Sequence, residues 1–320
     1  MILLMVSIGG MTRLTDSGLS ITSWKPISGM IPPLSLQDWQ AEFDAYKQIP
    51  EFTQQNFWMD LEAFKSIFWW EWGHRFLGRV IGLAFAIPFV IFLFQRRLSW
   101  RLAPSLATLF VLGGFQGFLG WWMVSSGLSE RVDVSQYRLA AHLSAASILF
   151  VAIVFVANRL VPQKSVSPHP PKRLWQLAFW GLALLVFLQI IMGAFVAGID
   201  AGFGFNTWPL MEGKWIPDNL APLSPLWLNL FENHLTVQFT HRMLGYVIGV
   251  VALVMFIFQA GQGPSPLHDW TRLVLLLIVA QILLGILTLL LVVPIPLALA
   301  HQALAFVALS VIVVATTKTS

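Results

Sequence analysis

The chain has 320 residues, of which 57% are hydrophobic and only 11% are charged, and its formal net charge is +4. An average soluble domain carries about 25% charged residues, so this composition excludes an ordinary water-soluble globule, a disordered chain and a nucleic-acid-binding protein. The sequence contains no cysteine, which excludes disulfides, thiolate metal ligands, iron–sulfur clusters and cysteine nucleophiles. The seven histidines are therefore the main candidates for ligand chemistry.

The first element is a short apolar run from Met1 to Met11. It is too short to cross a bilayer, because a transmembrane helix needs roughly 20 apolar residues. It also lacks the charged region and the cleavage site of a signal peptide. We expect it to be the outer end of a first transmembrane helix whose start precedes this sequence.

Seven longer apolar runs follow, each long enough to span a membrane. They cover residues 74–95, 104–125, 138–158, 174–198, 237–260, 272–292 and 296–316. Together with the first run they predict an all-α integral membrane protein with eight transmembrane helices.

The distribution of charge predicts the orientation of these helices. The loops after the second, fourth and sixth helices, together with the tail, hold nine basic residues and one acid, Asp269. Because positive charge stays on the cytoplasmic side, both termini are expected in the cytoplasm. The two large loops, at about 14–70 and 200–235, then face outward.

The two halves of the sequence resemble each other. Glu71–Gly78 (EWGHRFLG) aligns with Gln238–Gly245 (QFTHRMLG), and Ala141-His142 aligns with Ala300-His301. The other aligned positions in the first and second halves are Gly9, Asp16, Gly18, Trp24, Gln116 and Gly120 with Gly193, Asp200, Gly202, Trp208, Gln281 and Gly285.

Each repeat holds four helices, an even number, so both copies have the same orientation across the membrane. The sequence therefore predicts two pseudo-symmetric four-helix bundles. They are expected at residues 1–160 and 173–320, joined by a cytoplasmic linker at 161–172.

Four histidines are related by this repeat, His74, His142, His241 and His301, and each lies near the outer end of its helix. In an up-down-up-down bundle, the two helices that carry each pair are diagonal, with axes roughly 11–14 Å apart. Two histidines reaching across such a gap can hold one planar metal ring, which predicts one bis-histidine haem in each half. The alternatives are histidines that are hydrogen-bonded within a bundle, or a bare metal site, which lacks accompanying carboxylates. Ionisable residues at membrane depth are usually functional.

Arg75 and Arg242 directly follow the first histidine of each pair. An arginine fork suits a carboxylate, so we expect these side chains to contact haem propionates. The alternative is that they snorkel to the outer interface.

The halves differ at Glu71, which is replaced by Gln238 in the second half. Glu71 precedes His74 by three residues and shares its helix face. Its carboxylate could exchange protons or stabilise positive charge at the edge of a bound ring, whereas it could also be an exposed first-turn acid. The difference predicts one reactive site and one electron-handling site.

Several motifs span nearly the whole chain. They are Gly10–Pro26 (GMTRLTDSGLSITSWKP), Glu71–Arg75 (EWGHR), Ala141-His142, Thr240–Arg242 (THR) and Ala300-His301. With these motifs the sequence resembles the haem A synthase family. The resemblance implies oxidation of the C8 methyl group of haem O to a formyl group, giving haem A for haem-copper oxidases. The same resemblance implies that haem O binds near His74 and His142, that Glu71 is a functional glutamate, and that His241 and His301 hold a haem b cofactor.

The resemblance also implies partners and a location. Haem O synthase, oxidase assembly factors and the lipid bilayer are the expected partners, whereas the electron acceptor cannot be read from the sequence. Some members carry a cysteine pair in the first outer loop, and this chain lacks it, as in the proteobacterial and mitochondrial type. Without a transit peptide, we expect a bacterial inner membrane, with the haem sites toward the periplasm.

Two other functions remain open. A di-haem b-type cytochrome, in electron transfer or as a quinol oxidoreductase subunit, would need haems near both membrane faces, whereas all four histidines lie toward one. A transporter built on a parallel repeat would need polar or broken helices near the midplane. Only Gln116, Gln189 and Gln281 are modest candidates for that role.

Overall fold

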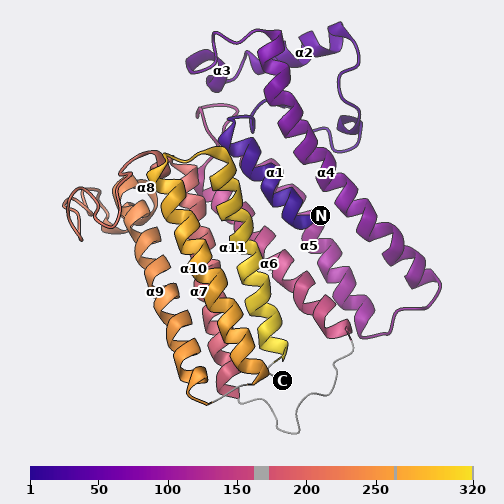
Figure 1. Ribbon diagram of the computed structural model, residues 1–320. Coiled ribbons are helices and arrows are strands. Elements are labelled where there is room, and N and C mark those ends of the chain that lie inside the picture. The colour runs from indigo at the N-terminus through magenta and orange to yellow at the C-terminus, as the bar shows by residue number, and fades with distance from the viewer. Residues whose placement is uncertain (162–172, 263–264, 319–320) are drawn as a thin grey trace. The chain divides into compact units, whose positions relative to one another are not determined.

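The computed structural model describes residues 1–161, 173–262 and 265–318, and within these ranges the regular elements are helices without any β-strand (Figure 1). Nearly all of the expected linker at 161–172 lies outside the described residues. The α-helices are α1 (Ile2–Leu14), α2 (Leu36–Tyr46), α3 (Pro50–Gln54), α4 (Leu61–Phe94), α5 (Leu102–Val124), α6 (Gln136–Leu160), α7 (Arg173–Gly198), α8 (Asn229–Glu232), α9 (His234–Ala260), α10 (Pro266–Leu290) and α11 (Ile295–Lys318). Three short 3-10 helices are η1 (Ser28–Met30), η2 (Ala201–Phe203) and η3 (Leu226–Leu228).

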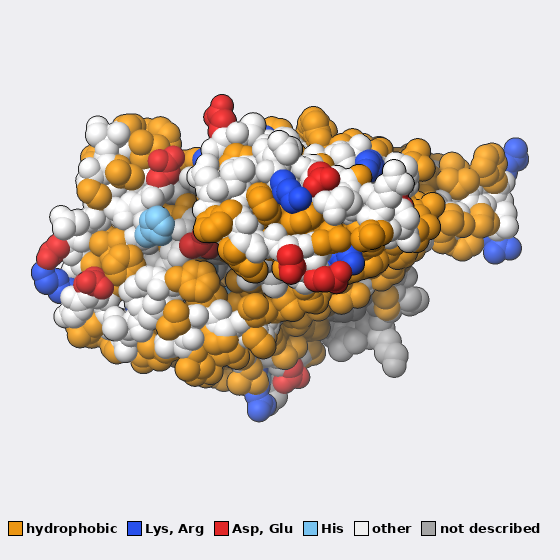
Figure 2. Space-filling model, turned by 90° about the horizontal axis from the view of Figure 1, so that it is seen from above, with side chains coloured by type: hydrophobic (Ala, Val, Ile, Leu, Met, Phe, Trp, Pro, Cys, Tyr) orange, Lys and Arg blue, Asp and Glu red, His pale blue; other side chains and the backbone are white. Residues whose placement is uncertain are grey.

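Seven of the described helices, α4 to α7 and α9 to α11, are long and apolar enough to cross a membrane. Their most apolar windows have a mean hydropathy between 1.5 and 3.0, and hydrophobic side chains cover much of the surface in view in Figure 2. These helices confirm the seven long runs and indicate a multi-pass membrane protein. The eighth predicted span corresponds to α1, which is apolar but shorter.

Two helices begin earlier than the sequence suggests, each at a capping residue. α4 begins at Leu61 rather than at 74, because the Asp60 side chain accepts a hydrogen bond of 2.8 Å from the Ala63 backbone N–H. α10 begins at Pro266 rather than at 272, and Ser265 caps it in the same way. The added segments, residues 61–73 of α4 and 266–271 of α10, contain too many polar or aromatic residues to be predicted as membrane-spanning from the sequence.

The first outer loop folds into a small helical cap, which we define as residues 15–60 together with the first turns of α4. A capping box starts α2, in which Ser35 and Asp38 each accept a hydrogen bond from the other's backbone N–H. Tyr46 and Phe64 are completely buried at the centre of the cap. The cap thus has its own hydrophobic core, and α2 packs directly on α4 (Figure 1).

The chain divides into two compact units, residues 1–145 and 146–320, and the division falls within α6. In the first unit, α4 packs against α1 and α5. In the second unit, α7 and α10 each pack against both α9 and α11. The four helices of the second unit therefore form a closed bundle in which α9 and α11 are diagonal to each other.

Candidate functional site

Each of the four repeat-related histidines lies against a glycine of a neighbouring helix. A Cβ atom added to the glycine would lie within about 3 Å of the histidine ring, which is closer than real Cβ atoms normally approach. The distances from this Cβ position to the ring Cε1 are 2.9 Å for Gly9 and His74, 3.1 Å for Gly120 and His142, 3.3 Å for Gly193 and His241, and 2.7 Å for Gly285 and His301. Glycine therefore makes room for the imidazole at all four places.

Three of these histidines also contact a glutamine side chain. The Nε2 atom of Gln116 donates to the His142 carbonyl oxygen at 2.9 Å and lies 3.1 Å from the ring Nδ1. Gln281 is placed in the same way on His301, at 2.9 Å and 3.2 Å. Gln189 donates to the His241 carbonyl oxygen at 2.9 Å and lies 3.2 Å from the ring Nε2. From the sequence alone, these glutamines were only modest candidates for the polar midplane residues that a transporter would need, and their contact with the histidines was missed.

The histidines of the second unit face each other across the diagonal of the bundle. The ring centroids of His241 and His301 are 6.4 Å apart. Bonds between a metal ion and an imidazole nitrogen are about 2.0 to 2.1 Å long, so two rings on opposite sides of one metal ion have centroids roughly 6 Å apart. The observed spacing fits a single metal ion between the rings.

Glu71 and Arg75 tie the loop after α1 to α4, and we call this arrangement the first clamp. The Glu71 side chain is 3% exposed, and its Oε2 atom accepts hydrogen bonds from Ser20 Oγ at 2.8 Å and from the Ile21 backbone N–H at 2.7 Å. Its Oε1 atom accepts from Arg75 at 2.6 Å and 3.1 Å. Arg75 also donates to the carbonyl oxygens of Ile21 and Ser23. Glu71 is thus a buried, fully engaged carboxylate rather than an exposed acid.

Gln238 and Arg242 tie the loop after α7 to α9, and we call this arrangement the second clamp. The Gln238 amide nitrogen donates to the carbonyl oxygens of Ala201 and Gly204, both at 2.7 Å, and its oxygen accepts from Arg242 at 2.7 Å. Arg242 also donates to the carbonyl oxygens of Phe205 and Thr207. The two clamps thus occupy aligned positions in the sequence and hold the loop that follows the first helix of each repeat.

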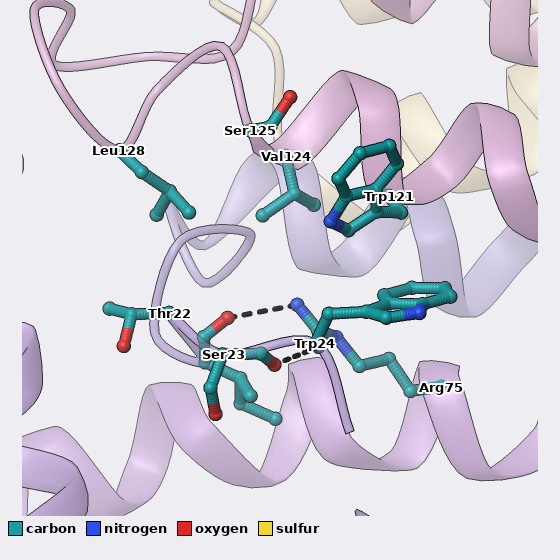
Figure 3. Close-up of a pocket in the computed structure, with 9 residues that line it drawn as sticks. Thr22, Ser23, Trp24, Arg75, Trp121, Val124, Ser125 and Leu128 are labelled. Atoms are coloured by element: carbon teal, nitrogen blue, oxygen red, sulfur yellow. Dashed lines mark hydrogen bonds between the residues drawn. The ribbon is translucent and has the colours of Figure 1, made fainter. Parts of the chain in front are cut away.

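The first clamp borders a small cavity, shown in Figure 3, where the Arg75 side chain points into the loop formed by Thr22, Ser23 and Trp24. The Trp24 ring lies against that of Trp121 from α5, with centroids 6.1 Å apart. The cavity holds about 20 Å³, which is room for one water molecule. It is far too small for a haem.

A second small cavity, of about 30 Å³, lies in the same unit beside the end of α1. It is lined by Glu51 from α3 and by Arg13, Asp16 and Asp133. Arg13 forms ion pairs of 3.1 Å with both aspartates, whereas the Oε2 atom of the buried Glu51 has no hydrogen-bond partner among the described residues. Burial, and then the negative charges of Asp16 and Asp133, raise the pKa of Glu51 to about 8.

The residues present in the second unit fit a haem. Within the described residues, no group of three or more histidine, aspartate or glutamate side chains could hold a bare metal ion. Paired histidines suit instead an iron whose other ligands come from a planar macrocycle. The buried Nε atom of Arg242 has no hydrogen-bond partner in the described part of the chain, so it can still bind a carboxylate such as a propionate.

The fold and these paired histidines define a class, that of multi-pass helical membrane proteins suited to bind haem. The model of a family described as "Cytochrome oxidase assembly protein" matches residues 1–313, and the chain belongs to this family.

Named relatives are similar to the chain over nearly its whole length. A haem A synthase of Parvibaculum lavamentivorans is 51% identical over 98% of this chain and 89% of the relative. A haem A synthase of Azorhizobium caulinodans is 53% identical over 94% and 86%, and one of Rhizobium meliloti is 48% identical over 95% and 83%.

Proposed function

We propose that this chain catalyses the haem A synthase reaction, in which the C8 methyl group of haem O is oxidised to a formyl group. The observation that carries the proposal is the identity of about one half with haem A synthases along nearly the full chain. The four histidines whose rings pack against glycines support it, because two of them lie in each compact unit. The product, haem A, serves haem-copper oxidases.

The two pairs have different tasks in this proposal. His74 and His142 bind the iron of the substrate haem O in the N-terminal half, 1–160. His241 and His301 hold a haem b cofactor in the C-terminal half, 173–320. The 6.4 Å spacing of the second pair supports that assignment. When bound, haem b supplies one-electron redox chemistry.

The membrane arrangement follows from the same proposal. Eight transmembrane helices form two pseudo-symmetric four-helix bundles, and α1 belongs to the first of them. Both termini face the cytoplasm of a bacterial cell, and the haem sites lie toward the periplasmic side of its inner membrane. The charge distribution of the loops supports this orientation. Haem O synthase and oxidase assembly factors are the proposed partners, together with an electron acceptor outside the membrane.

The clamp residues contribute in two ways. Arg75 and Arg242 fix the loops after α1 and α7, and a remaining N–H of each guanidinium contacts a propionate. Glu71 holds a buried negative charge one helical turn from His74. Its carboxylate exchanges a proton, or stabilises the developing positive charge, at the edge of the substrate ring.

The proposal is tested by extracting and chromatographing the haems from a host that lacks haem A, with and without a co-expressed haem O synthase. Haem A or its hydroxylated precursor is expected only when haem O is supplied. It should be lost in His74→Ala and retained in His234→Ala, a matched control because His234 is exposed at the start of α9. Haem b alone under both conditions, in a folded protein, would instead identify a di-haem cytochrome.

The role of Glu71 has its own test. Glu71→Gln should stall oxidation while the protein still binds haem, because an amide cannot carry the carboxylate's charge or exchange its proton. The amount of haem A and the amount of bound haem are measured in the same membranes. A variant that makes haem A at the normal rate contradicts this role.

A further inference from the structure

We call the residues of a neighbouring helix that contact a histidine ring the seat of that histidine. Three of the four seats share one pattern, a glutamine followed four residues later by a glycine. Residues four apart lie on the same face of a helix, so the amide and the bare backbone meet the same imidazole. The pairs are Gln116 and Gly120 on α5, Gln189 and Gly193 on α7, and Gln281 and Gly285 on α10.

The seat of His74 departs from this pattern. Its glycine is Gly9 on α1, and the residue four positions earlier is Met5. A thioether cannot donate a hydrogen bond and accepts only weakly. In the described part of the chain, the buried Nδ1 atoms of His74 and His241 both lack a hydrogen-bond partner, but the Gln189 amide lies 3.2 Å from the other ring nitrogen of His241, and His74 has no such amide neighbour there.

The Met5 side chain occupies the position in the first unit that the Gln189 amide occupies in the second. Its Cε atom lies 3.2 Å from where a Cβ on Gly78 would be, and the Gln189 amide nitrogen lies 3.5 Å from where a Cβ on Gly245 would be. Gly78 and Gly245 are aligned in the sequence repeat. The two side chains therefore end at corresponding places, and only one of them can hold a histidine.

A hydrogen bond donated by the second ring N–H to an acceptor orients a metal-bound imidazole and makes it a stronger ligand. Losing such a partner typically weakens metal binding by about 10- to 100-fold. In the three amide-held seats the atom beside the ring is the amide nitrogen, a donor. The acceptor is the glutamine oxygen at the other end of the same amide, which is buried without a partner in the described chain and would face a metal-bound ring if the amide turned over. His74 has neither.

We propose that Met5 makes His74 the exchangeable iron ligand of the first unit, through which the substrate haem enters and the product leaves. The inference rests on the proposed function. A haem that is a substrate has to depart after each reaction, whereas a resident cofactor has to stay. The sequence places the one seat without an amide in the unit assigned to the substrate, so Met5 is a positioning residue for release.

The test measures how fast haem b, used as the probe, leaves each site for an excess of a haem-scavenging apoprotein. The full chain is held in lipid nanodiscs. His301→Ala restricts loading to the first site, and His142→Ala restricts it to the second. Met5→Gln in the first background should slow release by roughly 10- to 100-fold. Gln189→Met in the second background should speed release by a similar factor.

Met5→Leu is the matched control, since leucine has a similar size but no amide, and it should leave the release rate unchanged. If Met5→Leu slows release as much as Met5→Gln, packing rather than hydrogen bonding is responsible and the proposal is overturned. Should Met5→Gln not fold, an unchanged release rate in Gln189→Met overturns it equally.

The outcome also separates this inference from the proposed function. If adding His74→Ala does not reduce haem loading of the His301→Ala protein, the proposed substrate site is wrong and the role of Met5 falls with it. If His74→Ala abolishes loading but Met5→Gln releases haem at the original rate, only the role of Met5 is overturned.

Discussion

The two clamps occupy aligned positions but hold their loops with opposite hydrogen-bonding polarity. In the first clamp the loop offers donors, a hydroxyl and a backbone N–H, and the Glu71 carboxylate accepts from both. In the second clamp the loop offers two carbonyl oxygens, and the Gln238 amide donates to both. Each side chain also binds the arginine four residues later. The side chain at this position therefore matches the groups that its loop presents.

The comparison changes how the difference between glutamate and glutamine is understood. From sequence alone, the exchange suggests one reactive and one passive site. The structure adds a second reason for it, because neither side chain could replace the other without leaving polar groups unpaired. A loss of activity on changing Glu71 can thus come from the clamp as well as from its charge, and the two clamps have to be compared directly.

The largest effect is expected from removing each clamp in turn. Glu71→Ala leaves a partly buried arginine and two loop donors without their acceptor, which should cost about 3 kcal/mol or more. Gln238→Ala leaves two neutral carbonyl oxygens and one N–H of Arg242 without their partner, while Arg242 keeps its bonds to Phe205 and Thr207, and it should cost about 1–3 kcal/mol. Thermal unfolding in detergent measures both.

Glu62→Ala serves as the control on the same helix, because its ion pair with Lys65 is exposed and should contribute less than about 1 kcal/mol. Equal losses for Glu71→Ala and Gln238→Ala would show that ionic and neutral clamps stabilise the chain equally.

An intermediate effect is expected from adding a methyl group at the histidine seats. Overpacking typically costs about 1–3 kcal/mol, and Gly285→Ala, with 2.7 Å to the ring, should displace its histidine more than Gly193→Ala, with 3.3 Å. Since 1.4 kcal/mol corresponds to tenfold in affinity, Gly285→Ala should reduce haem affinity about tenfold. Haem content and the reduced-minus-oxidised spectrum measure the loss. Gly181→Ala, where the added atom meets nothing within 4 Å, should keep full haem content, and a loss there would point to a general defect of α7.

A separate, pH-dependent effect concerns the cap of the first unit alone. The unfolded chain releases the Glu51 proton near pH 4.5, whereas the folded chain keeps it to about pH 8. Within that window the folded state binds more protons, so stability should fall as the pH rises from 4.5 to 8. Asp16, Asp133, Glu71 and Tyr46 act on this group.

Glu51→Gln should remove this slope, because the amide stays neutral, and the variant should be more stable than the original chain above pH 8. Unfolding midpoints measured across the window test this. A slope that persists in Glu51→Gln would assign the pH dependence to the neighbouring acids.

Much of the membrane part of the fold could be predicted, because apolar runs of sufficient length have few alternatives in a bilayer. The runs at 104–125 and 174–198 differ from α5 and α7 by no more than two residues. The cap could not be predicted from hydropathy, since its helices are short and their core forms between distant residues such as Tyr46 and Phe64. The capping box at Ser35 and Asp38 is the local signal that could have indicated α2.

The candidate site could also be predicted only in part, because several of its contacts join residues that are distant in the sequence. The repeat identified the four histidines, and the spacing of Glu71 and Arg75 by four residues indicates a helix-face ion pair. The loop atoms that complete the clamp come from about 50 residues away, and nothing local in the sequence marks them. Gln116 and Gln281 are aligned in the sequence repeat. That they contact a histidine ring, however, is visible only in the structure.

The glutamine–glycine pairs also have a consequence for reading other sequences. Because the amide and the bare backbone must share one helix face, the seat is written as Q-x-x-x-G, and it contacts a histidine here at 116–120, 189–193 and 281–285. The same pattern also occurs at 259–263, where α9 ends, so it has to lie within a helix to mark a seat. This short signature can be searched in other helical membrane proteins, next to helices that carry a single histidine. Some metal-binding seats will keep the glycine but have an apolar residue in place of the glutamine. By the same reasoning, the histidine in such a seat is the ligand expected to dissociate from the metal first.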